Sequence, residues 1–166
     1  MFTDGSHIDG RLPRACQSLG WAFTVLDASL NLVCTAFGVP PKWIDSIQGA
    51  ELWAVNMALQ HVQFPPKLYT DCNSVRQGTQ RPLEWASSSK RKFARVWSCI
   101  SLQLEGTPEV VQWIPAHTSK ASIGEKLCSD GEIVSEEYWC SNQMVDLLAK
   151  DAANSICVSE AFRSRY

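Results

Sequence analysis

The sequence lacks any long run of hydrophobic residues. No stretch approaches the roughly 18 consecutive apolar residues that a membrane-spanning helix needs, so we expect no membrane partner. No basic start or apolar stretch follows Met1, which argues against a secretory signal peptide. Internal repeats, linkers and low-complexity segments are also missing, and 166 residues suit a single domain over residues 1–166. The chain is 45% hydrophobic and contains seven tryptophans, a composition that excludes intrinsic disorder.

The cysteine patterns of zinc-binding and disulfide-rich proteins are missing too. The seven cysteines form no CxxC pair, and the three histidines do not lie near a cysteine pair at the spacing of zinc ligands. The number of cysteines is odd, and most lie in apolar runs, where a free thiol packs as a small hydrophobic group. We therefore expect reduced thiols in an intracellular protein, cytoplasmic or nuclear and not secreted.

The chain has no overall surplus of positive charge, since 15 Lys and Arg face 17 Asp and Glu for a formal net charge of −2. Taken alone, this balance argues against a nucleic-acid partner. The charge is unevenly distributed, however, because residues 76–95 hold six basic residues against Glu84 alone, a net of +5. This segment either binds phosphates, with an affinity that falls as salt rises, or forms a solvated start of a helix. Its basic residues are Arg76, Arg81, Lys90, Arg91, Lys92 and Arg95.

Strand patterns alternate with helix patterns along the chain. Runs of β-branched and aromatic residues predict strands, and apolar residues at 3.6-residue spacing predict helices. The alternation predicts an α/β domain whose mixed sheet is covered by helices. The predicted strands are 19–26, 30–39, 67–70 and 110–114, the predicted helices are 48–62, 74–78, 93–104 and about 142–158, and 118–141 is predicted to be a loop.

Four carboxylates lie where a charge needs a partner. Asp4 and Asp71 each follow a short apolar run that predicts a strand ending at that point. Glu51 lies in the first turn of an otherwise apolar helix, and Asp146 lies between two apolar residues of the last helix. Each acid also has a simpler explanation, as a turn residue, a helix cap, a favourable charge near a helix N-terminus, or a solvated side chain. Together they suggest a site for Mg²⁺, which prefers oxygen ligands and would offset the cost of burying carboxylates.

Four blocks of sequence, in one order, resemble the type 1 ribonuclease H family, most closely the ribonuclease H domains of retroelement reverse transcriptases. They are FTDGS at 2–6, QGAELWAVNMAL at 48–59, YTDCNSVRQG at 69–78, and WIPAHTS at 113–119 followed by NQMVDLLAKDAA at 142–153. The resemblance covers nearly the whole chain and implies a ribonuclease H-like fold with a central mixed five-stranded sheet flanked by helices. It also implies an endonuclease that cuts the RNA strand of RNA–DNA hybrids and leaves 5′-phosphate and 3′-hydroxyl ends.

The resemblance implies roles for individual residues. Asp4, Glu51, Asp71 and Asp146 would hold two Mg²⁺ ions, which Mn²⁺ could replace. His117 matches a mobile-loop histidine that shuttles a proton or assists product release, although it could also be a plain surface histidine. The residues that match hybrid-binding positions are Gly5, Ser6, Gln48, Asn73 and Asn142, together with the basic residues Arg76, Lys90, Arg91 and Lys92. For Asn142, a role as N-cap of the last helix is an alternative.

The chain departs from the family pattern at three places. The residues after Ser6 lack the glycine-rich run of many cellular members, and 118–141 is an unusually long, acidic insertion. We expect this insertion to be inert, with a lid or a docking surface as alternatives. Few residues precede Asp4, so we expect the chain to be a fragment of a longer polyprotein with a covalently linked polymerase domain.

Two other functions are compatible with the same motifs. One is a catalytically weak or inactive hybrid-binding domain of a retroelement, although all four acids are present. The other is a nuclease of the same superfold that acts on DNA, such as an integrase or a resolvase. Those enzymes lack the combination of the YTDCNSVRQG block and the histidine loop, and cleavage of a DNA duplex would reveal them.

Overall fold

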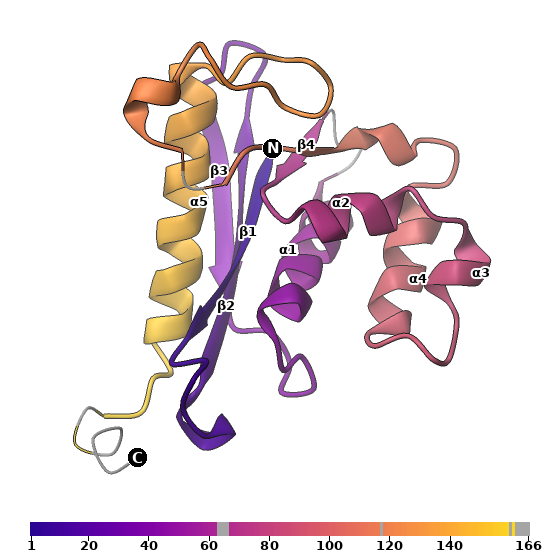
Figure 1. Ribbon diagram of the computed structural model, residues 1–166, viewed down its shortest axis with the longest axis vertical. Coiled ribbons are helices and arrows are strands. Elements are labelled where there is room, and N and C mark those ends of the chain that lie inside the picture. The colour runs from indigo at the N-terminus through magenta and orange to yellow at the C-terminus, as the bar shows by residue number, and fades with distance from the viewer. Residues whose placement is uncertain (63–66, 117, 160, 162–166) are drawn as a thin grey trace.

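A five-stranded mixed sheet forms the centre of the domain. The computed structural model describes residues 1–62, 67–116, 118–159 and 161. The strands are β1 (Phe2–Ile8), β2 (Ser18–Leu26), β3 (Leu32–Gly38), β4 (Leu68–Thr70) and β5 (Val111–Trp113). Their order is β3-β2-β1-β4-β5 (Figure 1), with β1 and β3 antiparallel to β2, and β4 parallel to both β1 and β5. The predicted mixed five-stranded sheet is confirmed.

Helices cover both faces of this sheet (Figure 1). The helices are α1 (Ile47–His61), α2 (Asn73–Thr79), α3 (Leu83–Ala86), α4 (Ala94–Gln103) and α5 (Glu136–Asn154), and short 3₁₀ turns span Arg14–Cys16, Pro108–Val110 and Lys120–Ser122. One hydrophobic core, with Leu52, Val55 and Ile100, packs α1 and α4 against the sheet. A second core on the other face, with Phe2 and Val145, packs α5 against it. The predicted α/β layering is therefore present.

The first strand is longer than the sequence indicated. Asp4 was expected to end a short strand, but β1 continues to Ile8, so Asp4 lies within the strand. The reason is its pairing with β2, which runs from Phe2 opposite Thr24 to Ile8 opposite Ser18. These residues lack a strong apolar pattern of their own, and the partner strand makes them extended.

The last helix also differs from its prediction at both ends. It begins at Glu136, because the Ser135 side chain accepts a hydrogen bond from the Tyr138 N–H and caps the helix. The predicted loop over 118–141 is thus six residues too long, and Asn142 is not an N-cap but lies buried inside α5. At the other end α5 stops at Asn154 instead of 158, and Ile156 beyond it is half exposed.

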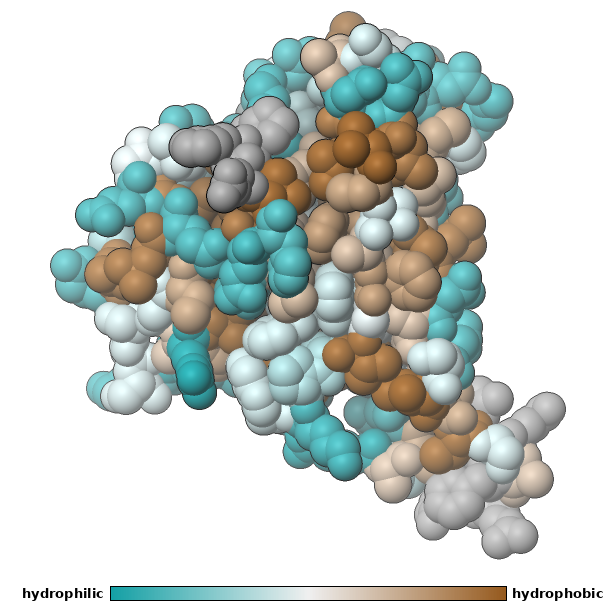
Figure 2. Space-filling view, turned by 180° about the vertical axis from the view of Figure 1, so that it is seen from behind, coloured by the Kyte–Doolittle hydropathy of each residue, from teal (hydrophilic) through white to brown (hydrophobic). Residues whose placement is uncertain are grey.

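The outer strand β3 leaves hydrophobic side chains in solvent. Val33 is 61% exposed and Phe37 is 52% exposed. The side of the molecule opposite to that of Figure 1 carries several hydrophobic patches separated by hydrophilic residues (Figure 2). None of the described helices is long and apolar enough to cross a membrane.

Candidate active site

Three of the four predicted acids come together at one place. Side-chain ligand atoms of Asp4, Glu51 and Asp71 all lie within 4.8 Å of one another. Asp4 comes from the middle of β1, Glu51 from the first turns of α1, and Asp71 from the position directly after β4. Three carboxylates from distant parts of the sequence therefore face one small volume.

Strand register and a close helix contact produce this convergence. β1 and β4 are parallel, with Thr3 opposite Thr70, so the next residues, Asp4 and Asp71, follow at the same level of the sheet. Gly5 then lets α1 approach β1, since a Cβ at Gly5 would lie 2.3 Å from the main-chain nitrogen of Glu51. The missing side chain of Gly5 thus serves packing against α1, and its expected contact with RNA stays a prediction.

Burial and mutual repulsion make these acids reluctant to ionise. Burial, together with the negative charges of Asp71 and Asp146, raises the pKa of Asp4 to about 8. Burial, with the charges of Asp4 and Asp71, also places the pKa of Glu51 well above its usual range. Hydrogen bonding by the Gly5 backbone opposes both shifts but does not cancel them.

Two oxygens of the cluster lack a partner within the part of the chain that the structure describes. Asp4 Oδ2 and Glu51 Oε2 are buried and accept no hydrogen bond from any described residue. Buried polar atoms are normally paired, and an unpaired one costs about 1–3 kcal/mol. A divalent cation would supply the missing partner, and an all-oxygen donor set is the kind that Mg²⁺ or Mn²⁺ prefers. The residues therefore fit such an ion.

Asp146 lies close to the three acids but outside their cluster. Its charge raises the pKa of Asp4, which places the two carboxyls within electrostatic reach of each other. Its side chain is 22% exposed and its Oδ2 lies 2.6 Å from Lys150 Nζ, one turn along α5. Asp146 is thus paired with a cation of its own helix, at the rim of the site.

Asp71 is held by a residue that sequence reasoning did not single out. The indole Nε1 of Trp113 donates a hydrogen bond to the Asp71 main-chain oxygen at 3.0 Å. Trp113 ends β5, and its register partner on β4 is Thr70, the residue before Asp71. The sequence predicted both strands, 67–70 and 110–114, but the contact depends on their parallel pairing, which the sequence did not indicate.

The predicted hybrid-binding residues fall into two groups. Ser6 and Asn142 are buried, whereas Gln48 and Asn73 are exposed. Gln48 Nε2 donates to Ser74 Oγ at 3.1 Å and so joins the start of α1 to α2. His117 lies outside the described residues.

The basic segment is organised around Trp85. The Arg91 guanidinium lies 3.2 Å above the Trp85 ring centre, and Arg91 Nε donates to the Trp85 main-chain oxygen. Lys92 pairs with Asp45 at 2.6 Å, and Lys90 is exposed, while Arg76 on α2 is half-buried. A hollow of about 300 Å³ lies here, with Gln48, Arg81, Trp85, Arg91 and Lys92 among its lining residues.

Comparison with known proteins agrees with this architecture. The RNase H family model matches residues 1–154. The solution structure of the PFV RNase H domain has a TM-score of 0.60 at 18% identity and covers 93% of each chain. A foamy viral protease-reverse transcriptase in complex with dsDNA gives 0.61 at 22% identity, with 93% of each chain covered.

A larger structure shows the same fold within a longer chain. The foamy viral protease-reverse transcriptase in complex with an RNA/DNA hybrid has a TM-score of 0.64 at 18% identity. The match covers 93% of this chain, which spans about a fifth (20%) of the length of that one. Identities this low establish the fold alone, and no curated protein sequence gives a significant match.

Proposed function

The chain belongs to the RNase H family, and from this premise we propose that it is a metal-dependent endonuclease that hydrolyses the RNA strand of RNA–DNA hybrids. The convergence of Asp4, Glu51 and Asp71, with two buried oxygens that no described residue satisfies, is the observation that carries the proposal. The products would have 5′-phosphate and 3′-hydroxyl ends. Nothing in a purely structural domain would require two buried carboxylates and a third, partly exposed one so close together.

Asp4, Glu51, Asp71 and Asp146 would hold two Mg²⁺ or Mn²⁺ ions. When bound, such a pair of ions supplies an activated water and stabilises the charge on the leaving oxygen. The protein's part is to hold four carboxylates in place and to keep Asp4 and Glu51 away from bulk water. Asp146 would exchange part of its pairing with Lys150 for a place in the metal site.

The substrate would lie along the start of α1 and the basic segment. Gln48, Asn73 and Asn142 have amides that can donate to and accept from the base edges and 2′-hydroxyls of a minor groove, and Gly5 and Ser6 lie next to Asp4 on β1. Basic residues beyond α2, Lys90, Arg91 and Lys92, would contact phosphates, so affinity should fall with rising salt. His117 would shuttle a proton or assist product release.

The comparison with a longer chain bears on the setting in which the domain works. We propose that the domain works beside a covalently linked polymerase in a longer intracellular polyprotein. The support is that this chain matches about a fifth of a protease-reverse transcriptase chain.

Cleavage of a 5′-labelled RNA–DNA hybrid in Mg²⁺ tests the function. We expect the natural chain to cut the RNA strand and Asp71→Asn to be slower by about 10³-fold, since removing a metal ligand forfeits several kcal/mol of transition-state stabilisation. Asp151→Asn, an exposed acid on the same helix as Asp146, should keep full activity. Failure of the natural chain to cut the hybrid would favour an inactive hybrid-binding domain. Equal cleavage of a DNA duplex would favour the alternative nuclease.

A further inference from the structure

The insertion between the histidine loop and α5 contains a small hairpin at residues 127–133, here called the edge hairpin. Leu127 pairs with Ile133 across it, and the Cys128 N–H donates to the Glu132 main-chain oxygen. Gly131 has a φ of +85°, a conformation that permits the tight turn between the two sides. Cys128 and the following Val134 are buried in the same core as Phe2. The edge hairpin is therefore anchored to the domain at Cys128, while its paired residues Leu127 and Ile133 remain 55% and 54% exposed.

The edge hairpin binds the outer side of β5 through Ser129. The Ser129 N–H donates to the Trp113 main-chain oxygen at 2.9 Å, and the Trp113 N–H donates to Ser129 Oγ at 2.8 Å. Ser129 Oγ in turn donates to Gln112 Oε1 at 2.6 Å. One serine thus satisfies both main-chain groups of Trp113 on the edge of the sheet, where they would otherwise face solvent.

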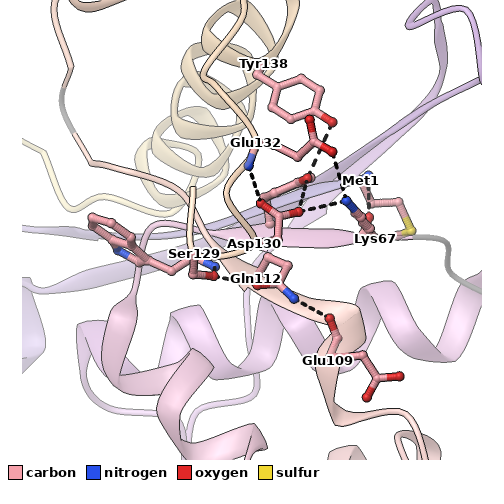
Figure 3. A network of polar contacts seen from close by, with 10 residues as sticks. Met1, Lys67, Glu109, Gln112, Ser129, Asp130, Glu132 and Tyr138 are labelled. Atoms are coloured by element: carbon pink, nitrogen blue, oxygen red, sulfur yellow. Dashed lines mark hydrogen bonds and ion pairs between the residues drawn. The ribbon is translucent and has the colours of Figure 1, made fainter. Parts of the chain in front are cut away.

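The next residue of the edge hairpin binds the neighbouring strand. Asp130 Oδ2 accepts hydrogen bonds from Tyr69 Oη of β4 and from Lys67 Nζ, each at 2.9 Å. Figure 3 shows Asp130 at the centre of these contacts, with Ser129 and Gln112 beside it. The Asp130 side chain is only 10% exposed. Two adjacent residues of the insertion therefore fasten β5 and β4.

The contacts of Ser129 with Trp113 continue to the carboxylate cluster of Asp4, Glu51 and Asp71. β4 and β5 are three residues long, so their own ladder has few hydrogen bonds. Asp71 follows β4 at once, and Trp113 Nε1 binds its main-chain oxygen. A chain of contacts consequently runs from Ser129 through Trp113 to Asp71. Functional groups must be held to within about 0.5 Å, and a misplacement of about 1 Å can cost 10²-fold in rate.

We propose that Trp113 is a positioning residue for Asp71 and that the edge hairpin keeps Trp113 in place through Ser129. This inference rests on the proposed function for its purpose, because it assumes that Asp71 is a metal ligand. It replaces the expectation that the insertion is inert. The acids of the insertion are partly compensated as well, since Lys67 pairs with Asp130 and Glu132, and Lys120 pairs with Glu136.

The test measures Mn²⁺ binding to the metal-free protein, using the EPR signal of the free aqua ion. We expect Trp113→Phe, which keeps an aromatic ring but loses the N–H donor, to weaken Mn²⁺ binding about 10-fold, in line with changes to residues that orient metal ligands. Ser129→Ala should weaken it about 3-fold. Trp139→Phe is the matched control, because Trp139 Nε1 also donates to a main-chain oxygen, that of Thr118 at 2.9 Å, but joins α5 to the start of the insertion and does not contact Ser129 or Asp71 in the described contacts. It should change Mn²⁺ affinity less than 2-fold.

The outcomes separate a positioning role from general stability and from the proposed function. Natural Mn²⁺ affinity in both Trp113→Phe and Ser129→Ala, or equal weakening in Trp139→Phe, would overturn the inference. Hybrid cleavage should show the matching split, with kcat lowered and KM for the hybrid unchanged in Trp113→Phe. If the natural chain binds Mn²⁺ but cuts no hybrid, the proposed function fails while the positioning role can still be measured. If Trp113→Phe does not fold, Ser129→Ala decides alone.

Discussion

The two outer strands of the sheet, β3 and β5, are held in place in different ways. The β3 edge is seven residues long, pairs with β2 along its length, and leaves Val33 and Phe37 in solvent. The β5 edge is three residues long, pairs with another three-residue strand, and is covered by the edge hairpin. The long edge is held by its own ladder, and the short edge needs help from elsewhere in the chain.

The difference matters because the short strands carry the site. Asp71 follows β4, and its charge raises the pKa of Asp4 and of Glu51, so the position of the end of β4 affects the whole carboxylate cluster. The turn that leads into β3 also holds an acid, Asp27, but this side chain is stabilised locally. It accepts hydrogen bonds from the main-chain N–H groups of Ser29 and Asn31. The contacts from the insertion are thus found at the β5 edge, next to the proposed metal ligand Asp71.

The largest expected effect on stability concerns the charge of Asp4 in the carboxylate cluster. Because the pKa of Asp4 is raised to about 8, its contribution to the stability of the metal-free protein is present below pH 4 and lost as the pH rises to about 8. Asp4→Asn removes that loss, so we expect a gain of several kcal/mol in the free energy of unfolding at pH 8 in EDTA, and almost none at pH 4. Urea unfolding at both pH values measures it.

The turn before β3 provides the opposite case. Hydrogen bonds led by the Asn31 backbone lower the pKa of Asp27, so Asp27→Asn should destabilise the protein at pH 8 and not at low pH. The signs of the two substitutions at pH 8 should therefore differ. A loss of stability in Asp4→Asn at pH 8 would show that the carboxylate cluster is not under electrostatic tension.

A matched pair of valines compares the packing at the two edges. Val134, which follows the edge hairpin, is 1% exposed, whereas Val33 on β3 is 61% exposed. We expect Val134→Ala to lower the free energy of unfolding by about 2 kcal/mol, through lost burial and a residual cavity. Val33→Ala should stay within about 0.5 kcal/mol of the natural chain. Equal losses in urea unfolding would mean that the edge hairpin is no better packed than the bare edge.

Much of the fold was predictable because its signals are local. β-branched runs gave β2 and β3 to within two residues, and apolar spacing gave α1 and α4 to within one. The extent of β1 was not predictable, because residues 5–8 are extended by pairing with β2. The start of α5 was missed because residues 136–141 show no helical spacing of apolar residues. Tyr138 and Trp139 pack against a core formed by distant residues, Phe2 among them.

The site was predictable in part for the same physical reason. Strand ends and a helix start indicated Asp71 and Glu51, their chemistry suggested a Mg²⁺ site, and the resemblance added a second ion and a substrate, but none of these gave the 4.8 Å convergence. That distance depends on the register of β1 against β4 and on the room left by Gly5. Trp113 begins the WIPAHTS block and Ser129 lies outside every block, but no motif indicated their contacts, which form only where β5 and the insertion meet.

The smallest expected effect isolates the second contact of the edge hairpin. Burial alone would raise the pKa of Asp130, but hydrogen bonds from Lys67 and Tyr69 lower it below its usual value. Its contribution to stability is therefore present above about pH 4 and lost as the pH falls further. We expect Asp130→Asn to cost about 1 kcal/mol at pH 7 and nearly nothing at pH 3, measured by urea unfolding. Glu132→Gln, whose more exposed carboxylate lies 3.4 Å from the same lysine, should cost less than about 0.5 kcal/mol at either pH. If the two substitutions cost the same, the fastening of β4 is a surface ion pair, and the short edge relies on Ser129 alone.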